Sequence, residues 1–353
     1  MLKSHFNIAH DDEEEEEQEV EVDLPSPEEK EIIPDRLLKK PEISVRLSML
    51  GKTAEGNGYT YLKCKITELK LTNIDAIKGF KHIMFLDVSN NYLDTNALQA
   101  IACLPYLILI QADKNRITSA GFKQMKYLQV IILNDNQITS VDDVYQQHLS
   151  TVEIANNKIE KVSFAGVMPT LRVLDFRNNI IKDISNFDFP TLDSLYLAGN
   201  KLTTLVGLER CVNLRILHVR NNPIKLLNGF NAAQTKLQYI NLRNCQVSTL
   251  IQIKKLRVLT GLETLILRGC PYMGGSGTEE DDRDKEEDPQ LRVEMLASLP
   301  RLKRLNKEIV SPDERDEAKQ LMIQWLEEGE NDVEEVEDEP NVEEQSNVED
   351  ETN

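Results

Sequence analysis

The sequence lacks the features of several large protein classes. It has no run of about 18 apolar residues, and Met1 to Ala9 lead straight into the acidic run Asp11 to Glu17, so we expect neither a membrane span nor a secretion signal. Its five cysteines are odd in number and include no CxxC pair, which argues against a disulfide framework and a zinc module. We therefore expect a soluble protein of the reducing cytoplasm.

Catalytic signatures are missing as well. The histidines are His5, His10, His82, His148 and His218. Only His218 projects from a strand that the sequence predicts, and no serine or cysteine nucleophile occupies an equivalent place beside it, so no catalytic triad is indicated. The glycines at 274, 275 and 277 are not followed by the Lys-Ser/Thr of a phosphate-binding loop. We expect a non-enzyme that takes no metal, cofactor or small-molecule substrate.

Charge is distributed unevenly along the 353 residues. The formal net charge is −19, from 60 acidic and 41 basic side chains. Residues 1–31, 279–288 and 327–353 carry −11, −6 and −14, which leaves +12 on the rest of the chain. Because acidic runs repel themselves and bury no apolar surface, we expect disordered acidic tails over 1–33 and 331–353, which serve solubility or, alternatively, bind partners. No nucleic-acid-binding motif is present, so we expect no nucleic-acid partner.

Nine units of the sequence follow the pattern L-x-x-L-x-L-x-x-N-x-L. They start at Ile83, Leu107, Leu128, Leu149, Leu171, Leu192, Leu214, Leu237 and Leu262, with spacings of 21 to 25 residues. The first, fourth, sixth and eleventh positions give 36 sites, and all are apolar or aromatic in a chain whose hydrophobic content is 40%. A periodicity this strict is typical of leucine-rich repeats.

The ninth position of the pattern predicts how each unit turns off its strand. Asparagine occupies it in the first seven units, followed by Cys245 and Cys270. A carboxamide can satisfy both backbone donors and backbone acceptors at such a turn. We expect Cys245 and Cys270 to have the same structural role as the asparagines, the alternative being a redox or metal role. Cys64, Cys103 and Cys211 lie among apolar neighbours in the sequence, and we expect them to be structural as well.

The repeats predict an α/β leucine-rich repeat solenoid with units of about 22 residues. Each L-x-x-L-x-L segment forms a strand, and the strands stack into a parallel β-sheet on the concave face. Apolar residues of the return path, such as Val141 and Val144, leave room only for 3₁₀ or other short turns on the convex face. We expect the repeats and a closing unit over 61–306, with an acidic insert at 275–288.

Both ends of such a stack need a cap because its apolar core would otherwise be exposed. We expect an N-terminal cap over 34–60, in which Pro41 to Leu50 form a short helix with Ile43, Leu47 and Leu50 on one side.

At the other end, Leu291 to Leu305 repeat the strand signature and close the stack. A C-terminal helix follows over 307–330, with Ser311, Pro312 and Glu314 as its capping box and Gly329 as its end. Its apolar stripe either packs on the solenoid or docks on a neighbouring protein, and consists of Ala318, Leu321, Met322 and Trp325.

Residues between the core positions of each strand should point out of the concave face. The N-terminal half of this face is acidic, with Asp87, Asp113 and Glu153 among its members. The C-terminal half carries an arginine column beside tyrosine and histidine, a composition typical of binding hot spots. The predicted partner-binding residues are Arg177, Tyr196, His218, Arg220, Tyr239, Arg243 and Arg268.

Arginines stacked on neighbouring strands repel one another unless a counter-charge is supplied. We therefore expect this column to hold an acidic segment, either a partner's or the chain's own 279–288 loop. The alternative is a solvated ladder in which Arg177 pairs with Asp175 or Glu153.

Three segments of the chain resemble the ciliary leucine-rich repeat protein 23 family. They are the repeats at 192–230, the segment leading into the repeats at 47–77, and the closing segment at 299–330. The most telling residues are Gly51, Lys52, Thr53, Gly56, Asn57 and Gly58 at the front, and Lys307, Glu308, Glu314, Arg315 and Ala318 at the back. The resemblance covers about residues 45–330, and the insert around 275–288 departs from the family pattern.

This resemblance implies a non-catalytic scaffold in the radial spokes of motile cilia, at the head of the third spoke. Its implied partners are other radial spoke and axonemal proteins, and its implied location is the cytoplasm, cytoskeleton and cilium axoneme, with no membrane contact. Two other classes stay open: a regulatory subunit that steers a protein phosphatase with the concave face, and an acidic nuclear chaperone. The brevity of residues 327–353 argues against the chaperone.

Overall fold

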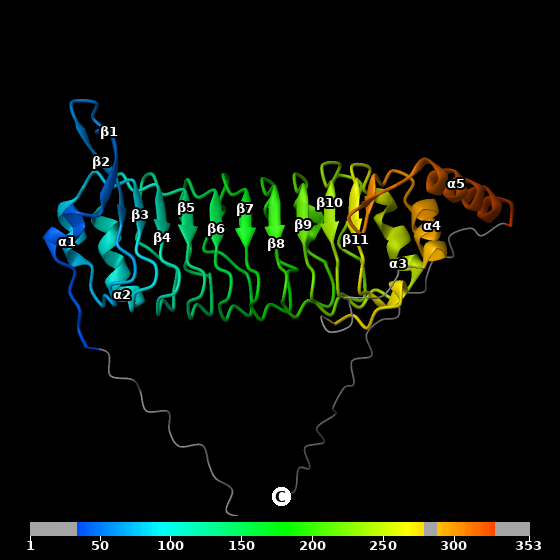
Figure 1. The fold of residues 1–353 in the computed structure, drawn as a ribbon, viewed down its shortest axis with the longest axis horizontal. Helices are drawn as coiled ribbons and strands as arrows, with labels where there is room; N and C mark the ends of the chain where they lie inside the picture. The colour runs from blue at the N-terminus through cyan, green and yellow to red at the C-terminus, as the bar shows by residue number, and fades with distance from the viewer. Residues whose placement is uncertain (1–33, 279–287, 329–353) are drawn as a thin grey trace, which may run out of the picture. The chain divides into compact units, whose positions relative to one another are not determined.

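The computed structural model describes residues 34–278 and 288–328. The chain divides into two units, Met1–Asp35 and Arg36–Asn353, and the first lies almost wholly outside the described residues. The acidic tails expected over 1–33 and 331–353, and most of the acidic insert, also lie outside them. From Arg36 onward the described chain forms a solenoid of stacked repeats (Figure 1).

One continuous sheet of 13 strands, in sequence order, runs through the solenoid. The pairings from β2 to β12 are parallel, and antiparallel pairs, β1 with β2 and β12 with β13, close the two ends. The strands are β1 (Leu47–Lys52), β2 (Tyr59–Lys65), β3 (Phe85–Asp87), β4 (Leu109–Gln111), β5 (Val130–Ile132), β6 (Thr151–Glu153), β7 (Val173–Asp175), β8 (Ser194–Tyr196), β9 (Ile216–His218), β10 (Tyr239–Asn241), β11 (Thr264–Ile266), β12 (Arg304–Leu305) and β13 (Glu308–Ile309). The predicted parallel sheet and solenoid are therefore confirmed.

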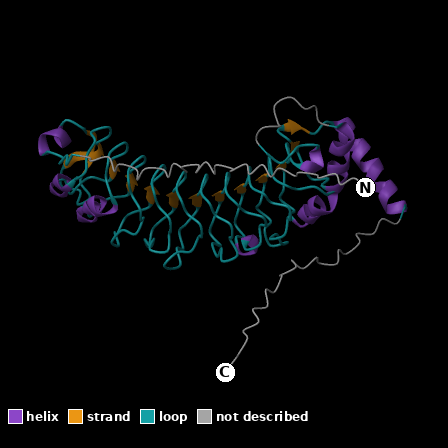
Figure 2. Cartoon of the chain, turned by 90° about the horizontal axis from the view of Figure 1, so that it is seen from below, coloured by secondary structure: helices purple, strands orange, loops and turns teal. Residues whose placement is uncertain are grey.

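Helices are short, and most of them gather towards the two ends of the solenoid (Figure 2). They are α1 (Lys40–Ser44), η1 (Asp75–Gly79), α2 (Thr95–Leu98), η2 (Gln99–Cys103), η3 (Leu208–Arg210), α3 (Leu250–Lys254), η4 (Lys255–Val258), η5 (Pro271–Met273), α4 (Pro289–Ser298) and α5 (Pro312–Glu327). The two longest repeat spacings, 24 and 25 residues, contain the pairs α2 and η2, and α3 and η4. The shorter units return through turns or a single 3₁₀ helix because they have no residues to spare.

The core of the solenoid is the repeat pattern itself. Every first, fourth, sixth and eleventh residue of the nine units is buried except Tyr272, which is partly buried against the core. Because the strands of these nine units, β3 to β11, are only three residues long, a unit cannot bury its apolar face alone, and stability comes from stacking.

The ninth-position side chains join each unit to the one before it. Asn157 is typical: its Oδ1 accepts from the amide of Ile138 at 2.9 Å, and its Nδ2 donates to the carbonyls of Leu133 and Ala155 at 3.0 Å. The thiol of Cys245 donates to the carbonyl of Val219 at 3.4 Å in the same place, which agrees with its predicted structural part.

Four of the five cysteines are buried, but Cys103 is exposed, contrary to the expectation that its apolar neighbours would enclose it. Cys103 is the last residue of η2, and that turn directs its side chain outward while Ile101 faces the core.

The N-terminal cap differs from the predicted helix over Pro41 to Leu50. Helix α1 ends at Ser44, and Leu47 to Lys52 form β1, which pairs with β2 as an antiparallel hairpin. Ile43 is fully buried, whereas Leu50 is 66% exposed. The spacing of Ile43, Leu47 and Leu50 fits a helix, but pairing with β2 supplies the backbone hydrogen bonds that the edge of the sheet would otherwise lack.

The C-terminal cap contains the predicted capping box but begins its helix later than residue 307. Ser311 Oγ accepts from the Glu314 amide at 3.2 Å, and Glu314 Oε2 accepts from the Ser311 amide at 2.7 Å, so α5 starts at Pro312. Residues 308 and 309 instead form β13. Ala318 is buried, and the rest of the predicted stripe is partly buried against the core, so the stripe packs on the solenoid.

Removing one ninth-position side chain tests this linkage. We expect Asn157→Ala to lower the free energy of unfolding by about 3 kcal/mol, because a buried amide and two carbonyls lose their partner. The measurement is the midpoint and slope of urea unfolding followed by circular dichroism. Lys158→Ala, at an exposed neighbouring position, is the control and should change stability by less than about 0.5 kcal/mol. Equal effects of the two substitutions would contradict the linkage.

Candidate interaction surface

The predicted partner-binding residues lie on or just beyond strands β7 to β11. Tyr196 and His218 end β8 and β9, Tyr239 begins β10, and the four arginines each follow the end of a strand by two residues. The parallel register pairs Tyr196 with His218 on the neighbouring strand. The repeat therefore brings residues spaced 20 to 25 apart in the sequence into columns.

Three aromatic side chains form a continuous stack, which we call the aromatic ladder: Tyr196, His218 and Tyr239. The ring centroids of Tyr196 and His218 are 5.0 Å apart with an interplanar angle of 22°, and those of His218 and Tyr239 are 4.8 Å apart at 34°. All three are half-buried. The sheet register pairs Tyr196 directly with His218, whereas Tyr239 pairs with Ile216 and reaches His218 diagonally from the neighbouring strand.

Arg220, Arg243 and Arg268 form what we call the basic column. Their units are held in register by backbone bonds, from the Asn221 amide to the Arg243 carbonyl at 2.9 Å and from the Asn244 amide to the Arg268 carbonyl at 3.0 Å. Arg220 is exposed, and Arg243 and Arg268 are half-buried. The column therefore presents positive charge at one position of three successive units.

Arg177 is placed differently from the basic column. Its Nη2 lies 2.6 Å from Asp175 Oδ2 and its Nε donates to the same carboxylate at 2.9 Å, which is the pairing that the sequence left as an alternative. Its guanidinium also lies 5.8 Å from the ring centroid of Tyr196. Arg177 thus neutralises Asp175 and covers the end of the aromatic ladder.

The electrostatic environment changes sign along the concave face. Burial, and then the charges of Arg220 and Arg177, lower the pKa of His218, so the imidazole is neutral at pH 7. In the N-terminal half, burial and the neighbouring carboxylates of Asp175 and Asp113 raise the pKa of Glu153. Each half therefore disfavours further charge of its own sign and favours the opposite sign.

Several positions expected to point out of the sheet are covered. Asp175, Asn241 and Ile266, at the fifth position of their units, are 5%, 8% and 3% exposed. Asp175 is covered because the longer side chain of Arg177 lies across it and donates to its carboxylate. The alternation of residues along a strand determines the side of the sheet to which a side chain points, but the neighbouring side chains determine how much of it is exposed to solvent.

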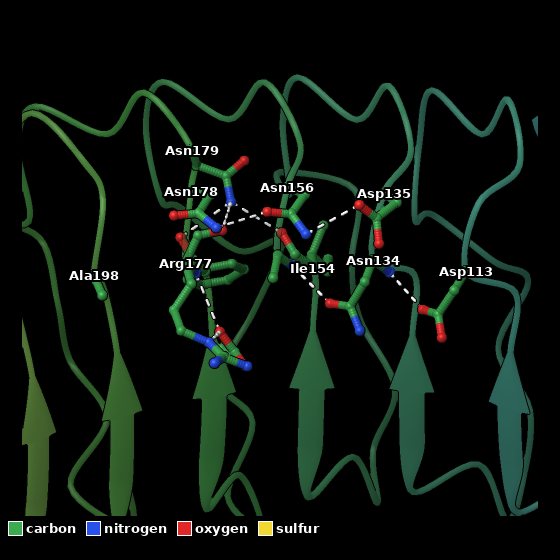
Figure 3. A network of polar contacts seen from close by, with 12 residues as sticks. Asp113, Asn134, Asp135, Ile154, Asn156, Arg177, Asn178, Asn179 and Ala198 are labelled. Atoms are coloured by element: carbon green, nitrogen blue, oxygen red, sulfur yellow. Dashed lines mark hydrogen bonds and ion pairs between the residues drawn. The ribbon is translucent and has the colours of Figure 1, made fainter.

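A second ladder at the eighth position was missed in the sequence. The backbone there has positive φ in every unit, at Asn90, Lys114, Asp135, Asn156, Asn178, Gly199, Asn221, Asn244 and Gly269. Asn156 Nδ2 donates to Asp135 Oδ1 at 3.0 Å, and Asn178 Nδ2 donates to Asn156 Oδ1 at 2.7 Å (Figure 3). The signal was the concentration of Asn, Asp and Gly, the residues that tolerate left-handed backbone, at one position.

Metal-ligand clusters and membrane-spanning helices are absent from the described residues. Within residues 34–278 and 288–328, no three His, Cys, Asp or Glu side chains come together as metal ligands. No helix in the same ranges is both long enough and apolar enough to cross a membrane. All five cysteines are free thiols, and burial raises the pKa of Cys211 to about 11.

Comparison with known proteins agrees with this geometry. The profile of the family Leucine Rich repeats (2 copies) matches residues 190–232. Human leucine-rich repeat-containing protein 23 is 32% identical over 296 residues, which span 83% of this chain and 81% of the human protein. The bovine protein of the same name is 32% identical over 279 residues, or 78% and 77% of the two chains. Among solved structures, the TLR13–ssRNA13 complex superposes with a TM-score of 0.52 at 23% identity, over 67% of this chain and 34% of that one, and shows the shared fold.

The parallel strands, the ninth-position asparagines and the outward columns define a leucine-rich repeat protein with an extended concave surface. Within that class, the identity over four-fifths of both chains is specific. The chain belongs to the leucine-rich repeat-containing protein 23 family.

The position of His218 between two tyrosines and beside Arg220 can be tested by titration. We expect Arg220→Glu to raise the pKa of His218, because a positive neighbour is replaced by a negative one. Histidine NMR signals measured against pH, with His218→Gln to assign the resonance, give the value. Lys201→Glu, an exposed charge change of equal size, should leave the titration unchanged. An identical curve in both variants would contradict the placement of Arg220.

Proposed function

We propose that this protein is a non-catalytic structural scaffold and protein-interaction subunit of the motile-cilium axoneme. We place it in the radial spoke, at the head of the third spoke, where it supports ciliary motility. The observation that carries the proposal is the ordered surface on the C-terminal half of the solenoid, the aromatic ladder beside the basic column. The axonemal location rests on what resemblance to the family implies.

The surface suits a protein partner for physical reasons. The tyrosine and histidine rings are already stacked, so little side-chain entropy is lost when a partner covers them. Arginine and tyrosine are enriched among residues that dominate binding energy. The partner segment that fits the basic column is acidic, because opposite charges attract across an interface.

The reversal of charge along the concave face would fix the orientation of a bound partner. A partner with acidic residues against the basic column and basic residues against Asp113 and Glu153 is attracted in one direction and repelled in the other. This favours a scaffold that fixes the direction of a neighbouring subunit. We propose that Tyr196, His218, Arg220, Tyr239, Arg243 and Arg268 make the contact, with Arg177 as their paired border residue.

A double charge reversal tests the surface. We expect Arg220→Glu/Arg243→Glu to reduce recovery of axonemal proteins in pull-down by at least about tenfold, because both charges then repel an acidic segment. Lys201→Glu/Lys225→Glu changes the same charge at two exposed positions outside the column and should behave as the unmodified protein. Equal recovery by the two variants would remove the basic column from the proposal.

Extraction of isolated cilia tests the scaffold. We expect the protein to stay with the microtubules in detergent and to be released by salt, because salt screens contacts between charged surfaces. The measurement is its distribution between pellet and supernatant on immunoblots. Recovery in the detergent-soluble fraction, in complex with a protein phosphatase catalytic subunit, would overturn the axonemal scaffold and favour the regulatory-subunit alternative.

A further inference from the structure

An apolar groove lies at the C-terminal end of the solenoid, well separated in sequence from the aromatic ladder. Its volume is about 350 Å³, and it is bounded by the last repeat, the end of α4 and helix α5. The apolar lining includes Leu256, Leu259, Leu262, Leu299, Met322 and Leu326. Leu326 is 74% exposed, so one wall of the groove is an uncovered leucine.

Polar groups in the groove indicate what would fill it. Ser298 lines the groove with no exposed surface, and its Oγ has no hydrogen-bond partner. Buried hydroxyls are nearly always hydrogen-bonded in native structures. Arg257 and Arg301, both exposed, also line the groove, and Arg257 Nε donates to the Ser298 carbonyl at 2.9 Å. The groove is therefore an apolar slot with two guanidinium groups at its border.

The chain itself continues from this place. Helix α5 ends at Glu327, directly after the groove residue Leu326. Residues 329–353 contain twelve acidic side chains and no basic one. Their only large apolar residues are Val333, Val336, Val342 and Val348. The segment thus combines valine side chains with the charge opposite to that of Arg257 and Arg301.

We propose that residues 329–353 dock in this groove, with Val333 and Val336 in the apolar slot and neighbouring carboxylates against Arg257 and Arg301. Val333 follows Glu328 by five residues, which span up to about 17 Å when extended, so the segment reaches the groove without crossing the solenoid. Covalent attachment gives the segment an effective concentration in the millimolar range, which a separate partner would have to exceed.

The test uses the full chain and compares two matched variants. Val333→Asp/Val336→Asp places charge in the slot, whereas Val342→Asp/Val348→Asp adds the same charge farther along the segment. Zero-length carbodiimide crosslinking with mass spectrometry then reports which lysines lie beside the carboxylates of residues 330–339. In the unmodified chain we expect crosslinks to Lys254, which lies 5.2 Å from the Trp325 ring centroid, and to Lys319, beside an adjoining small cavity.

The expected result is a loss of these crosslinks by about tenfold in Val333→Asp/Val336→Asp and no change in the matched variant. Trp325 is the only tryptophan and lies on α5, so its emission should shift to longer wavelength in the first variant only. Arg257→Glu/Arg301→Glu should reproduce the loss. Equal crosslinks and emission in both valine variants would overturn the proposal. Crosslinks joining ¹⁴N- and ¹⁵N-labelled chains would overturn it by assigning the groove to a second copy.

Discussion

The structure depends on the hydrogen bonds that each ninth-position side chain makes to the preceding unit. In all seven asparagine units the carboxamide oxygen accepts from an amide one unit back, and the nitrogen donates to a carbonyl one unit back. Strands of three residues could not hold their neighbours in register through sheet hydrogen bonds alone. The carboxamide fixes the register at the point where the backbone leaves the strand, and it satisfies groups that are buried there.

Fixed register orders the side chains of the outer surface. Once adjacent units are stacked at strand spacing, any residue type repeated at one position becomes a column. Tyr196 and His218 share one position and stack in this way, Tyr239 adds a diagonal contact to His218, and the basic column repeats arginine at one position. The first arrangement presents ring contacts that are already formed, and the second presents side chains of like charge whose sign is opposite to that of an acidic segment. The aromatic ladder and the basic column lie close together, so a partner could contact the preformed rings and the arginines at the same time.

Most of the fold follows from the sequence because a 22-residue period has one physical solution. The same local pattern recurs nine times and predicts the core positions, the parallel sheet and the role of the ninth-position asparagine. A wrong assignment in one unit therefore does not change the predicted fold. The N-terminal hairpin is different, because Leu47 and Leu50 fit helix spacing and only contact with β2 decides between helix and strand. The burial of Asp175 and the exposure of Cys103 likewise depend on the side-chain conformation of Arg177 and the direction of a 3₁₀ turn, which spacing does not encode.

The candidate surface and the C-terminal cap are physically connected. Asn306, which follows β12, accepts from the amides of Leu267 at 2.7 Å and Arg268 at 3.0 Å, so it holds the backbone of the last arginine of the basic column. Asn306 in turn lies between two cap elements, because β12 and β13 pair on either side of it. Arg292 of α4 donates to the Leu305 carbonyl at 3.1 Å and is ion-paired with Glu314 of α5. The cap therefore does more than cover the apolar end: it fixes the backbone position from which Arg268 extends, and a disturbance of α4 or α5 would be transmitted to the end of the basic column.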